Sequence, residues 1–331
     1  MDYNLKFMHK IAIIGCGQLG SRHLQGLLKI DLPISIDVVD LSDESLNLAK
    51  SRAKEIETKV KSENIRYLTL IDQMHDNIDL CIIATSANIR FKIIKELLKL
   101  KKVKNLILEK VLFQTIDEYL EANELFKQNK VSCWVNCPRP MFEIYKDIKS
   151  KISKNDLVTY IVTGGEWGLA CNAIHFIDNM AYLTQQSNFN YDHSGISKII
   201  DGKRNGFIEF VGTFLGRQKN GSELILHSRL DSNAPLKSQI FTENYSWSID
   251  ESSGVVIESS KENKWQEQTR KIQIPFQSDL TNHLASQILL EKQCDLTSYD
   301  ISMQLHKDMI ISFLNFYNSS INHISKVCPI T

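Results

Sequence analysis

Short apolar runs alternate with amphipathic segments over roughly the first 135 residues of the chain. The runs at residues 11–14, 36–40, 65–69, 78–85, 105–108 and 131–135 are rich in Ile, Leu and Val, which is typical of buried parallel strands. Between them, residues 20–28, 43–61, 92–104 and 115–128 carry apolar side chains at helical spacing. This alternation predicts a doubly wound parallel sheet, in which ligands bind beyond the carboxyl ends of the strands.

The pattern changes after Pro138 and Pro140, where longer alternating segments predict an antiparallel sheet. Residues 206–214 and 223–227 flank Lys219-Asn220-Gly221, which is a hairpin signal, and residues 246–249 and 255–257 flank a second turn. Helices are expected over residues 142–152, 172–183, 279–292 and 299–317. The predicted fold class is therefore α/β. A Rossmann domain covers residues 1–135, and an α+β domain for substrate binding and oligomerisation covers residues 136–331.

The first strand runs into the spacing Gly-x-Gly-x-x-Gly, formed by Gly15, Cys16, Gly17, Gln18, Leu19 and Gly20. Gly15 allows a tight turn, Gly17 lets the backbone approach a pyrophosphate, and Gly20 lets the next helix pack closely. Asp40 ends the second strand twenty residues later, where a carboxylate fits the ribose hydroxyls and repels a 2′-phosphate. The sequence thus predicts NAD as the cofactor rather than NADP. The alternative interpretation of Asp40 is a cap for the helix that follows.

Composition excludes several classes of partner. Lys plus Arg and Asp plus Glu are balanced at 39 each, so no overall charge favours nucleic acid or a membrane surface. The lysine-rich segment at 92–104 alternates with apolar residues and is interpreted as the solvated face of a helix. The seven cysteines are scattered without metal-ligand spacing, and no signal peptide or apolar span is evident, so we expect a reduced, cytoplasmic protein without a metal.

Two further stretches could carry reaction chemistry. Glu109 and Lys110 end a predicted strand, and by the strand-end rule they should converge with the glycine loop, with Asp40 and with the polar turn that holds Thr85, Ser86 and Asn88. The second stretch is the glycine-rich start of a helix on which Cys171, His175 and Asp178 share one side. His175 suits acid–base work because its ordinary pKa is near neutrality. Each residue also has a plain alternative, namely a surface lysine and a structural histidine.

Taken together, these motifs resemble the Gfo/Idh/MocA family of sugar and cyclitol oxidoreductases along essentially the whole chain. The matching segments are Gly15 to Gly20, Ala84-Thr85-Ser86, Glu109-Lys110-Val111, Asn136-Cys137-Pro138-Arg139 and Cys171-x-x-x-His175. The resemblance implies that Lys110 positions the reacting hydroxyl and that His175 accepts its proton. It also implies a sugar-type substrate, in one version a nucleotide sugar for surface glycans, and a homodimer or homotetramer. Arg139, Trp167, Cys171 and Asn172 are the candidates for substrate contact.

The chain departs from the family pattern at positions that bear on this reading. Val111 replaces a proline, which should relax a turn that is often cis, and Arg90 stands where the family often has histidine. Cys171 replaces an aspartate, and a thiol cannot orient an alcohol as a carboxylate does. Three alternatives therefore stay open: a cyclitol or other non-sugar substrate, a sensor or partner subunit with weakened catalysis, and, more remotely, chemistry at Cys171 itself.

Overall fold

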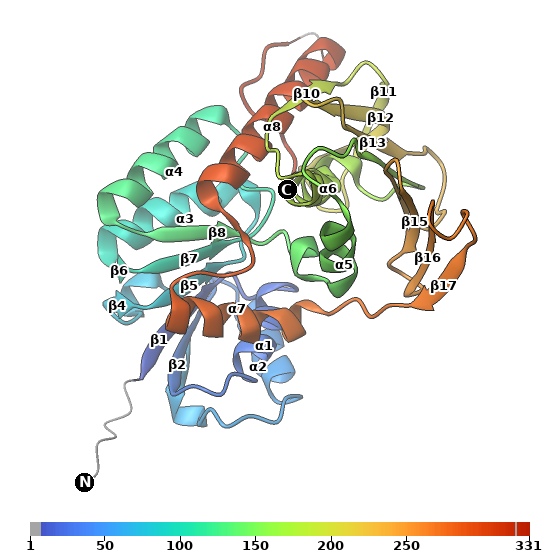
Figure 1. Cartoon of the computed structure of the whole chain (residues 1–331). Coiled ribbons are helices and arrows are strands. Elements are labelled where there is room, and N and C mark those ends of the chain that lie inside the picture. The colour runs from blue at the N-terminus through green and yellow to red at the C-terminus, as the bar shows by residue number, and fades with distance from the viewer. Residues whose placement is uncertain (1–7, 322) are drawn as a thin grey trace. The chain divides into compact units, whose positions relative to one another are not determined.

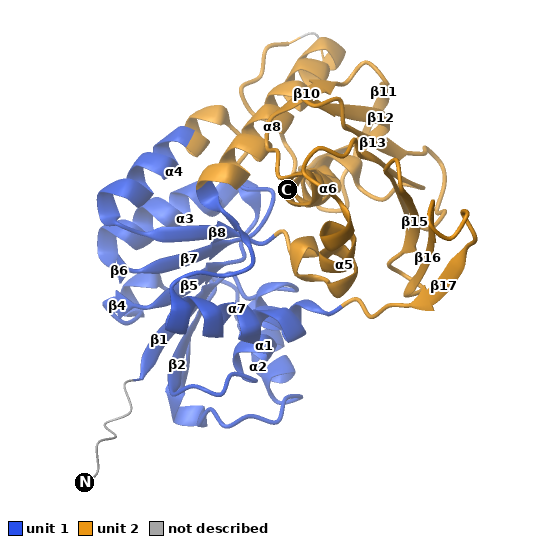
Figure 2. Ribbon diagram, in the orientation of Figure 1, with its two compact units in different colours: residues 1–112, 120–136, 275–299 blue, residues 113–119, 137–274, 300–331 orange. Residues whose placement is uncertain are grey.

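The computed structural model describes residues 8–321 and 323–331, which form two compact units (Figures 1 and 2). Unit 1 contains the described residues up to Leu112, together with Leu120–Asn136 and Pro275–Tyr299; unit 2 contains Phe113–Tyr119, Cys137–Ile274 and Asp300–Thr331. The predicted division at 135/136 differs from this one, because α7 (Gln277–Glu291) and β18 (Thr297–Ser298) return to unit 1. Helix α7 packs against α1 (Gly20–Leu27), and β18 pairs with β8 (Ser132–Val135).

Unit 1 is built on a seven-stranded sheet in the order β18-β8-β7-β5-β1-β2-β3. All neighbours are parallel except the edge pair β18–β8, so the predicted Rossmann sheet is confirmed. The remaining bounds are β1 (His9–Ile14), β2 (Ile34–Val39), β3 (Ile65–Leu68), β5 (Leu80–Ile83), β7 (Asn105–Leu108), α2 (Asp43–Ala53), α3 (Ala87–Leu100), α4 (Ile116–Asn129), η1 (Ser62–Asn64) and η2 (Ile71–Gln73).

Three predicted elements of unit 1 have different limits in the structure. The lysine-rich helix expected over residues 92–104 spans Ala87–Leu100, and residues 102–103 form a short strand instead. The run at 78–85 is broken at Asp79 into β4 (Asn77–Ile78) and β5, and β4 pairs with β6 (Lys102–Val103) in a ribbon of its own. The break occurs because the Asp79 carboxylate accepts a hydrogen bond from the Lys10 amide at 2.9 Å and pairs with Lys104 at 2.8 Å. Helix α2 stops at Ala53 rather than near residue 61, and the Thr58 hydroxyl donates to the Leu28 carbonyl instead.

Unit 2 holds a nine-stranded sheet in the order β10-β12-β13-β9-β14-β15-β16-β17, with β11 also paired to β12. Only β13–β9 is parallel, so the predicted mainly antiparallel sheet is confirmed. Helix α6 packs on β12 and β13. The bounds are β9 (Thr159–Gly164), β10 (Phe189–Asp192), β11 (Ile196–Asp201), β12 (Ile208–Gln218), β13 (Glu223–Ser228), β14 (Lys237–Phe241), β15 (Tyr245–Asp250), β16 (Val255–Ser260), β17 (Gln268–Lys271), η3 (Arg139–Met141), α5 (Glu143–Lys151), α6 (Leu169–Thr184) and α8 (Tyr299–Ile321).

No helix within residues 8–321 and 323–331 combines the length and the apolar character needed to span a membrane.

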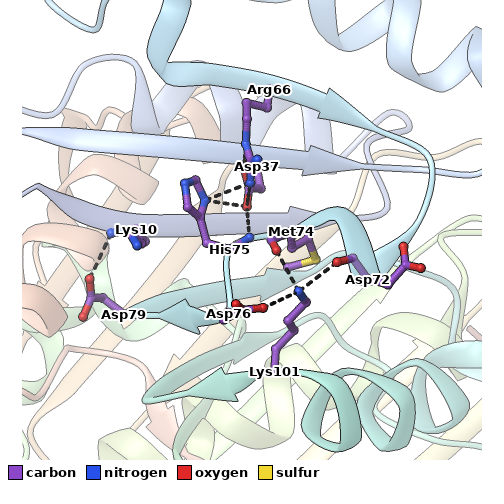
Figure 3. A network of polar contacts seen from close by, with 9 residues as sticks. All are labelled: Lys10, Asp37, Arg66, Asp72, Met74, His75, Asp76, Asp79 and Lys101. Carbon is purple, nitrogen blue, oxygen red and sulfur yellow. Dashed lines mark hydrogen bonds and ion pairs between the residues drawn. The ribbon is translucent and has the colours of Figure 1, made fainter.

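A buried carboxylate on β2 holds the loop that precedes β4 (Figure 3). Asp37 is 1% exposed and accepts two hydrogen bonds from the Arg66 guanidinium, at 2.8 and 2.9 Å. Its second oxygen also accepts from the His75 amide and faces the His75 ring, both at 2.8 Å. Nearby, the Lys101 ammonium donates to the carbonyls of Asp72 and Met74, which closes the same loop.

Replacing Asp37 by asparagine should lower the thermal unfolding midpoint of unit 1. Burial alone would raise the pKa of Asp37, but the hydrogen bonds from Arg66 and His75 outweigh it and hold the pKa below its ordinary 3.8. Stability from this group is therefore present above pH 3.8 and is lost as the pH falls through the lowered pKa of the folded state. We expect a loss of about 2 kcal/mol at pH 7, or roughly 4–8 °C by calorimetry.

The matched control is Asp31→Asn, which removes the same charge from an ion pair with Lys59 whose two side chains are 84% and 82% exposed. It should leave the midpoint unchanged. Equal midpoints for wild type and Asp37→Asn at pH 7 would contradict the assigned role of this network.

Candidate nucleotide-binding and active sites

The glycine loop joins β1 to α1, and the structure around each of its three glycines is different. Gly15 has a φ of +86°, and a Cβ there would lie 2.9 Å from the Thr85 amide nitrogen. A Cβ on Gly20 would lie 1.8 Å from the Gly15 carbonyl oxygen. A Cβ on Gly17 would meet no described protein atom within 4 Å, so packing does not require glycine at this position. The loop thus keeps open space at the residue that sequence analysis assigned to pyrophosphate approach.

Asp40 is attached directly to this loop. One carboxylate oxygen accepts a hydrogen bond from the Cys16 amide at 2.8 Å, and the other accepts from the Ser42 amide at 2.9 Å. The N-cap of α2 is Ser42, whose hydroxyl accepts a hydrogen bond from the Ser45 amide at 3.2 Å. Asp40 is therefore not the cap of this helix. Burial, followed by the neighbouring Asp40, raises the pKa of the Cys16 thiol to about 12. Cys16 is therefore a neutral packing residue whose backbone orients the carboxylate.

A second side chain contacts the loop, and the sequence alone did not identify it. The Arg52 guanidinium, from α2, donates to the Gln18 carbonyl at 2.7 Å and to its side-chain oxygen at 2.5 Å. It also donates to the Ser21 hydroxyl at 2.6 Å. Arg52 therefore braces the loop from the helix that follows Asp40. No local motif identifies it, because the contact joins residues 34 apart in sequence.

The strand ends after β5 and β7 are joined by Arg90, which is 1% exposed. Its guanidinium donates to the carbonyls of Thr85 and Val111, and to the Leu112 carbonyl at 2.8 Å. The Lys110–Val111 peptide is cis although Val111 is not proline, so the expected relaxation of this turn is not found. Arg90 thus positions the turn that carries Lys110, whose own side chain is half-buried.

The polar turn after β5 supplies a hydroxyl for a ligand. The Thr85 Oγ1 atom is buried and has no hydrogen-bond partner among the described residues. Ser86 stands at the start of α3 and donates to the Asn88 side-chain oxygen at 2.7 Å. A buried hydroxyl of this kind can bond to an ordered water or to a bound molecule. Together with the open space at Gly17, this atom fits a dinucleotide.

Glu109 follows β7 directly, as predicted, and contacts the helix that follows the glycine loop. It is 3% exposed, and its Oε1 atom lies 2.9 Å from His23 Nε2 and 2.5 Å from Asn136 Nδ2. Burial would raise the pKa of Glu109, but His23 and Asn136 outweigh it and lower the pKa. The hydrogen bonds of Glu109 with His23 and Asn136 are therefore internal to unit 1. His23 lies three residues beyond Gly20, yet its partners become visible only in the fold.

In unit 2, the first turn of α6 carries Cys171 and is capped by another element. Gly168 precedes the helix with a φ of +78° and contributes no side chain. The Glu209 carboxylate, from β12, instead accepts from the Ala170 amide at 2.7 Å and the Cys171 amide at 3.4 Å. A carboxylate thus lies beside the position where the family has aspartate, although it comes from a distant strand that sequence spacing could not connect with α6.

The other residues predicted for substrate contact have packing partners in unit 2. The Asn172 amide donates to the Trp167 carbonyl at 2.9 Å, and the Trp167 indole donates to the His227 carbonyl at 2.9 Å. The Trp167 ring also packs edge-on against Phe176, with 5.6 Å between centroids. His175 lies one turn beyond Cys171 and is half-buried like it, whereas Asp178 is 1% exposed.

Arg139 is engaged more firmly than the sequence suggested. Its guanidinium makes a two-pronged ion pair with Glu251, at 2.9 and 2.8 Å, and stacks 4.1 Å from the Phe176 ring centroid. The Tyr145 hydroxyl donates to the same carboxylate at 2.6 Å. Arg139 therefore joins the turn after β15 to α6. The two N–H groups that would bind a carboxylate or phosphate already donate to Glu251. This favours a role of Arg139 in positioning α6 over direct substrate binding.

Within the described residues, no group of three or more His, Cys, Asp or Glu side chains is arranged to hold a metal ion.

Residues 9–137 match the profile described as "Oxidoreductase family, NAD-binding Rossmann fold". No curated protein sequence matches the chain.

Solved structures share the fold along nearly the whole chain. UDP-N-acetylglucosamine 3-dehydrogenase GnnA from Acidithiobacillus ferrooxidans superposes with a TM-score of 0.71 at 12% identity, covering 92% of this chain and 97% of that one. An oxidoreductase from Agrobacterium radiobacter in complex with NAD+, L-tartaric acid and magnesium gives 0.70 at 13%, covering 95% and 96%. The super-repressor mutant of Gal80p from Saccharomyces cerevisiae gives 0.69 at 13%, also covering 95% and 96%. At these identities the likeness establishes the fold. The sequence match confirms, for residues 9–137, the resemblance drawn from the motifs: this part of the chain matches the NAD-binding Rossmann domain of the Gfo/Idh/MocA oxidoreductase family.

Proposed function

We propose that this protein is an NAD-dependent oxidoreductase that interconverts a secondary alcohol and a ketone on a sugar or nucleotide sugar. The observation that carries the proposal is the Asp40 carboxylate, fixed beside the glycine loop by the Cys16 amide. Each carboxylate oxygen has two lone pairs, so both can still accept a hydrogen bond from a ribose hydroxyl. A 2′-phosphate at the same place would be repelled, which favours NAD over NADP.

The remaining residues of unit 1 supply the other contacts that a dinucleotide needs. Gly17 leaves space for the pyrophosphate, and the positive end of the α1 dipole favours an anion. Thr85 offers its buried hydroxyl, and Ser86 and Asn88 lie on the same turn. When bound, NAD supplies the hydride acceptor or donor.

We assign the proton chemistry to Lys110 and His175. The Lys110 ammonium donates a hydrogen bond to the reacting oxygen and holds it in place. His175 accepts the hydroxyl proton as the carbon loses its hydride, and returns a proton in the reverse direction. Cys171 and Asn172 are half-buried on the first turn of the same helix and stay our candidates for substrate contact, with Trp167 as a stacking surface.

The substrate class rests on two arguments. Hydride transfer from a secondary alcohol requires cofactor placement and an acid–base group, and we assign these two tasks to residues named above. The superposable GnnA protein is named as a UDP-N-acetylglucosamine 3-dehydrogenase, so UDP-N-acetylglucosamine is the first compound to test. A role in surface glycan synthesis follows if a nucleotide sugar is turned over.

Titration with NADH and NADPH, followed by nucleotide fluorescence, tests the cofactor assignment. We expect NADH to bind at least tenfold more tightly than NADPH. Asp40→Asn should weaken NADH binding by about tenfold or more, because hydrogen bonds to a charged acceptor contribute roughly 1.5–3 kcal/mol. Asp43→Asn, an exposed residue at the start of α2, is the control and should change the affinity less than twofold. Equal affinities for the two nucleotides in wild type would overturn the NAD assignment.

A second candidate function is a dinucleotide-binding sensor or partner subunit without turnover. Cys171 at the position of the family's aspartate favours it, and the superposable Gal80p mutant is named as a super-repressor. A cyclitol or other non-sugar substrate is the remaining alternative. Screening sugars, nucleotide sugars and cyclitols for NADH formation separates the three: only the sensor binds NADH and turns over none of them.

We also propose that the protein forms a homodimer or homotetramer through the outer face of the unit 2 sheet. Leu215, Ile225 and Ile161 lie side by side on β12, β13 and β9, and each is half-exposed where its sequence neighbours are buried. Ile225→Asp should shift the species in light scattering from oligomer to monomer, while the exposed Lys198→Asp should not. A wild-type monomer at micromolar concentration would overturn this proposal.

A further inference from the structure

The side chain of Asn136 carries a buried oxygen, Oδ1, that has no hydrogen-bond partner among the described residues. Asn136 follows β8 directly and is 2% exposed. Its backbone amide donates to the Leu108 carbonyl at 2.8 Å, so the position of the residue is fixed by the sheet. An amide oxygen has two lone pairs and no proton, so the partner of Asn136 Oδ1 must be a donor. Buried acceptors of this kind bond to an ordered water or to a bound molecule.

The nitrogen of the same amide is fully used and fixes the direction of the oxygen. Nδ2 donates to Glu109 Oε1 at 2.5 Å and to the Gln277 side-chain oxygen at 2.8 Å. Burial opposes ionisation of Glu109, but hydrogen bonds with His23 and Asn136 outweigh it and hold the pKa of Glu109 below the ordinary value. Glu109 is therefore a carboxylate that can only accept, and the nitrogen of Asn136 must face it. Oδ1 is then the arm of the amide that points away from Glu109 and Gln277.

The strand order of unit 1 places this oxygen relative to the nucleotide loop. The sheet runs β8-β7-β5-β1-β2, so β8 is the third strand from β1 on the side opposite β2. The glycine loop follows β1 and Asp40 follows β2, which assigns the adenosine ribose to the β2 side. The nicotinamide half of a bound dinucleotide therefore extends from the pyrophosphate over the ends of β5, β7 and β8.

Two buried polar atoms that lack partners among the described residues follow strands on this side of the loop. Thr85 follows β5, the neighbour of β1, whereas Asn136 follows β8 and is the more distant of the two. The nicotinamide ribose is attached to the pyrophosphate and belongs to the near position. The base lies at the far end of the cofactor, and the NH2 group of its carboxamide is its one hydrogen-bond donor. That donor matches an atom that can only accept.

We propose that Asn136 Oδ1 accepts a hydrogen bond from the carboxamide NH2 group of bound NAD, and that Glu109 and Gln277 hold Asn136 in the orientation that this contact needs. The inference rests on the proposed function and deepens it, because it names the residue that recognises the nicotinamide end of the cofactor. The contact fixes the rotation of the nicotinamide ring about its bond to the ribose. Asn136 thereby determines which face of the ring is presented for hydride transfer.

Calorimetric titration of the full chain with NAD+ and two analogues tests the contact. Acetylpyridine adenine dinucleotide has a methyl group in place of the NH2 group, whereas thionicotinamide adenine dinucleotide keeps the NH2 group. We expect wild type to bind NAD+ at least about fivefold more tightly than the acetylpyridine analogue, which leaves Asn136 Oδ1 buried without a donor. The thionicotinamide analogue should bind within about threefold of NAD+, because it keeps the donor. Equal affinities for NAD+ and the acetylpyridine analogue would overturn the proposal.

Asn136→Ala shows whether this preference depends on Asn136. The variant should bind NAD+ and the acetylpyridine analogue with affinities that differ less than about twofold, because neither has an acceptor there. Gln277→Ala is the matched control: it disturbs the same network on the nitrogen side of Asn136 and leaves Oδ1 in place, so the fivefold preference should remain. A merely structural role of Asn136 would weaken both ligands equally. A wild-type preference that persists in Asn136→Ala would therefore overturn the contact.

A crystal structure of wild type with NAD+ decides the question if Asn136→Ala does not fold. The carboxamide nitrogen should lie within about 3.2 Å of Asn136 Oδ1. A water molecule on Oδ1, with the carboxamide bound elsewhere, would overturn the contact. Failure of the proposed function gives a different result: wild type would then bind neither NAD+ nor either analogue, and this contact would fall with it. Binding without any preference overturns the role of Asn136 alone.

Discussion

Turnover should fall at least tenfold, and by up to about 10⁴-fold, when His175 is replaced by alanine, because the reaction then lacks its acid–base group. NADH affinity should stay within twofold of wild type, since His175 lies in unit 2 and the nucleotide contacts that we assign lie in unit 1. The measurement is steady-state NADH formation on the substrate found by screening, with fluorescence titration of NADH on the same preparation.

The control for His175→Ala is His323→Ala, which removes an exposed histidine near the C-terminus and should leave both values unchanged. A variant at position 175 with full turnover would exclude His175 as the acid–base group. If instead neither wild type nor variant turned over any sugar, nucleotide sugar or cyclitol while both bound NADH, the sensor alternative would replace the enzyme.

The second large effect is expected from Arg90→Met, and it concerns stability as well as turnover. Methionine fills much of the volume but leaves the carbonyls of Thr85, Val111 and Leu112 without this donor in a buried site. Leaving a buried acceptor without its donor costs about 1–3 kcal/mol, so the loss over these carbonyls should be at least about 3 kcal/mol. The Thr85 and Lys110 turns would also lose their common support, so both NADH binding and kcat should decline.

Calorimetry and NADH titration of Arg90→Met check this prediction, with Lys99→Met as the control. Lys99 lies on the same helix with its side chain exposed, so the same substitution there should change neither the unfolding midpoint nor NADH binding. An unaltered midpoint for Arg90→Met would mean that other groups support these turns.

The sequence determined the elements and the chemistry that depends on local spacing. Apolar runs of a few residues separated by helical patterns predicted the Rossmann sheet, and the hairpin signal at Lys219-Asn220-Gly221 predicted the antiparallel sheet. Both predictions were possible because periodicity and turn residues are properties of neighbouring positions. At the start of α4, the Glu118 carboxylate accepts from the Thr115 amide at 3.2 Å, which is a local contact between residues three apart. The strand break at Asp79 was missed, because its partners Lys10 and Lys104 belong to other segments.

Only the tertiary structure decided which polar groups are held by contacts inside the protein. Glu109 is bonded to His23, 86 positions earlier, and Glu209 caps α6 from 39 positions away. Such contacts are set by strand order and helix packing, which bring distant residues together without any periodic trace in the chain. Arg139 is a further example. The sequence suggested that it contacts the substrate, but its partner in the structure is Glu251, 112 positions further along the chain. The local pattern therefore located the glycine loop and Asp40, whereas tertiary packing determined which residues, such as Arg52, hold the loop in place.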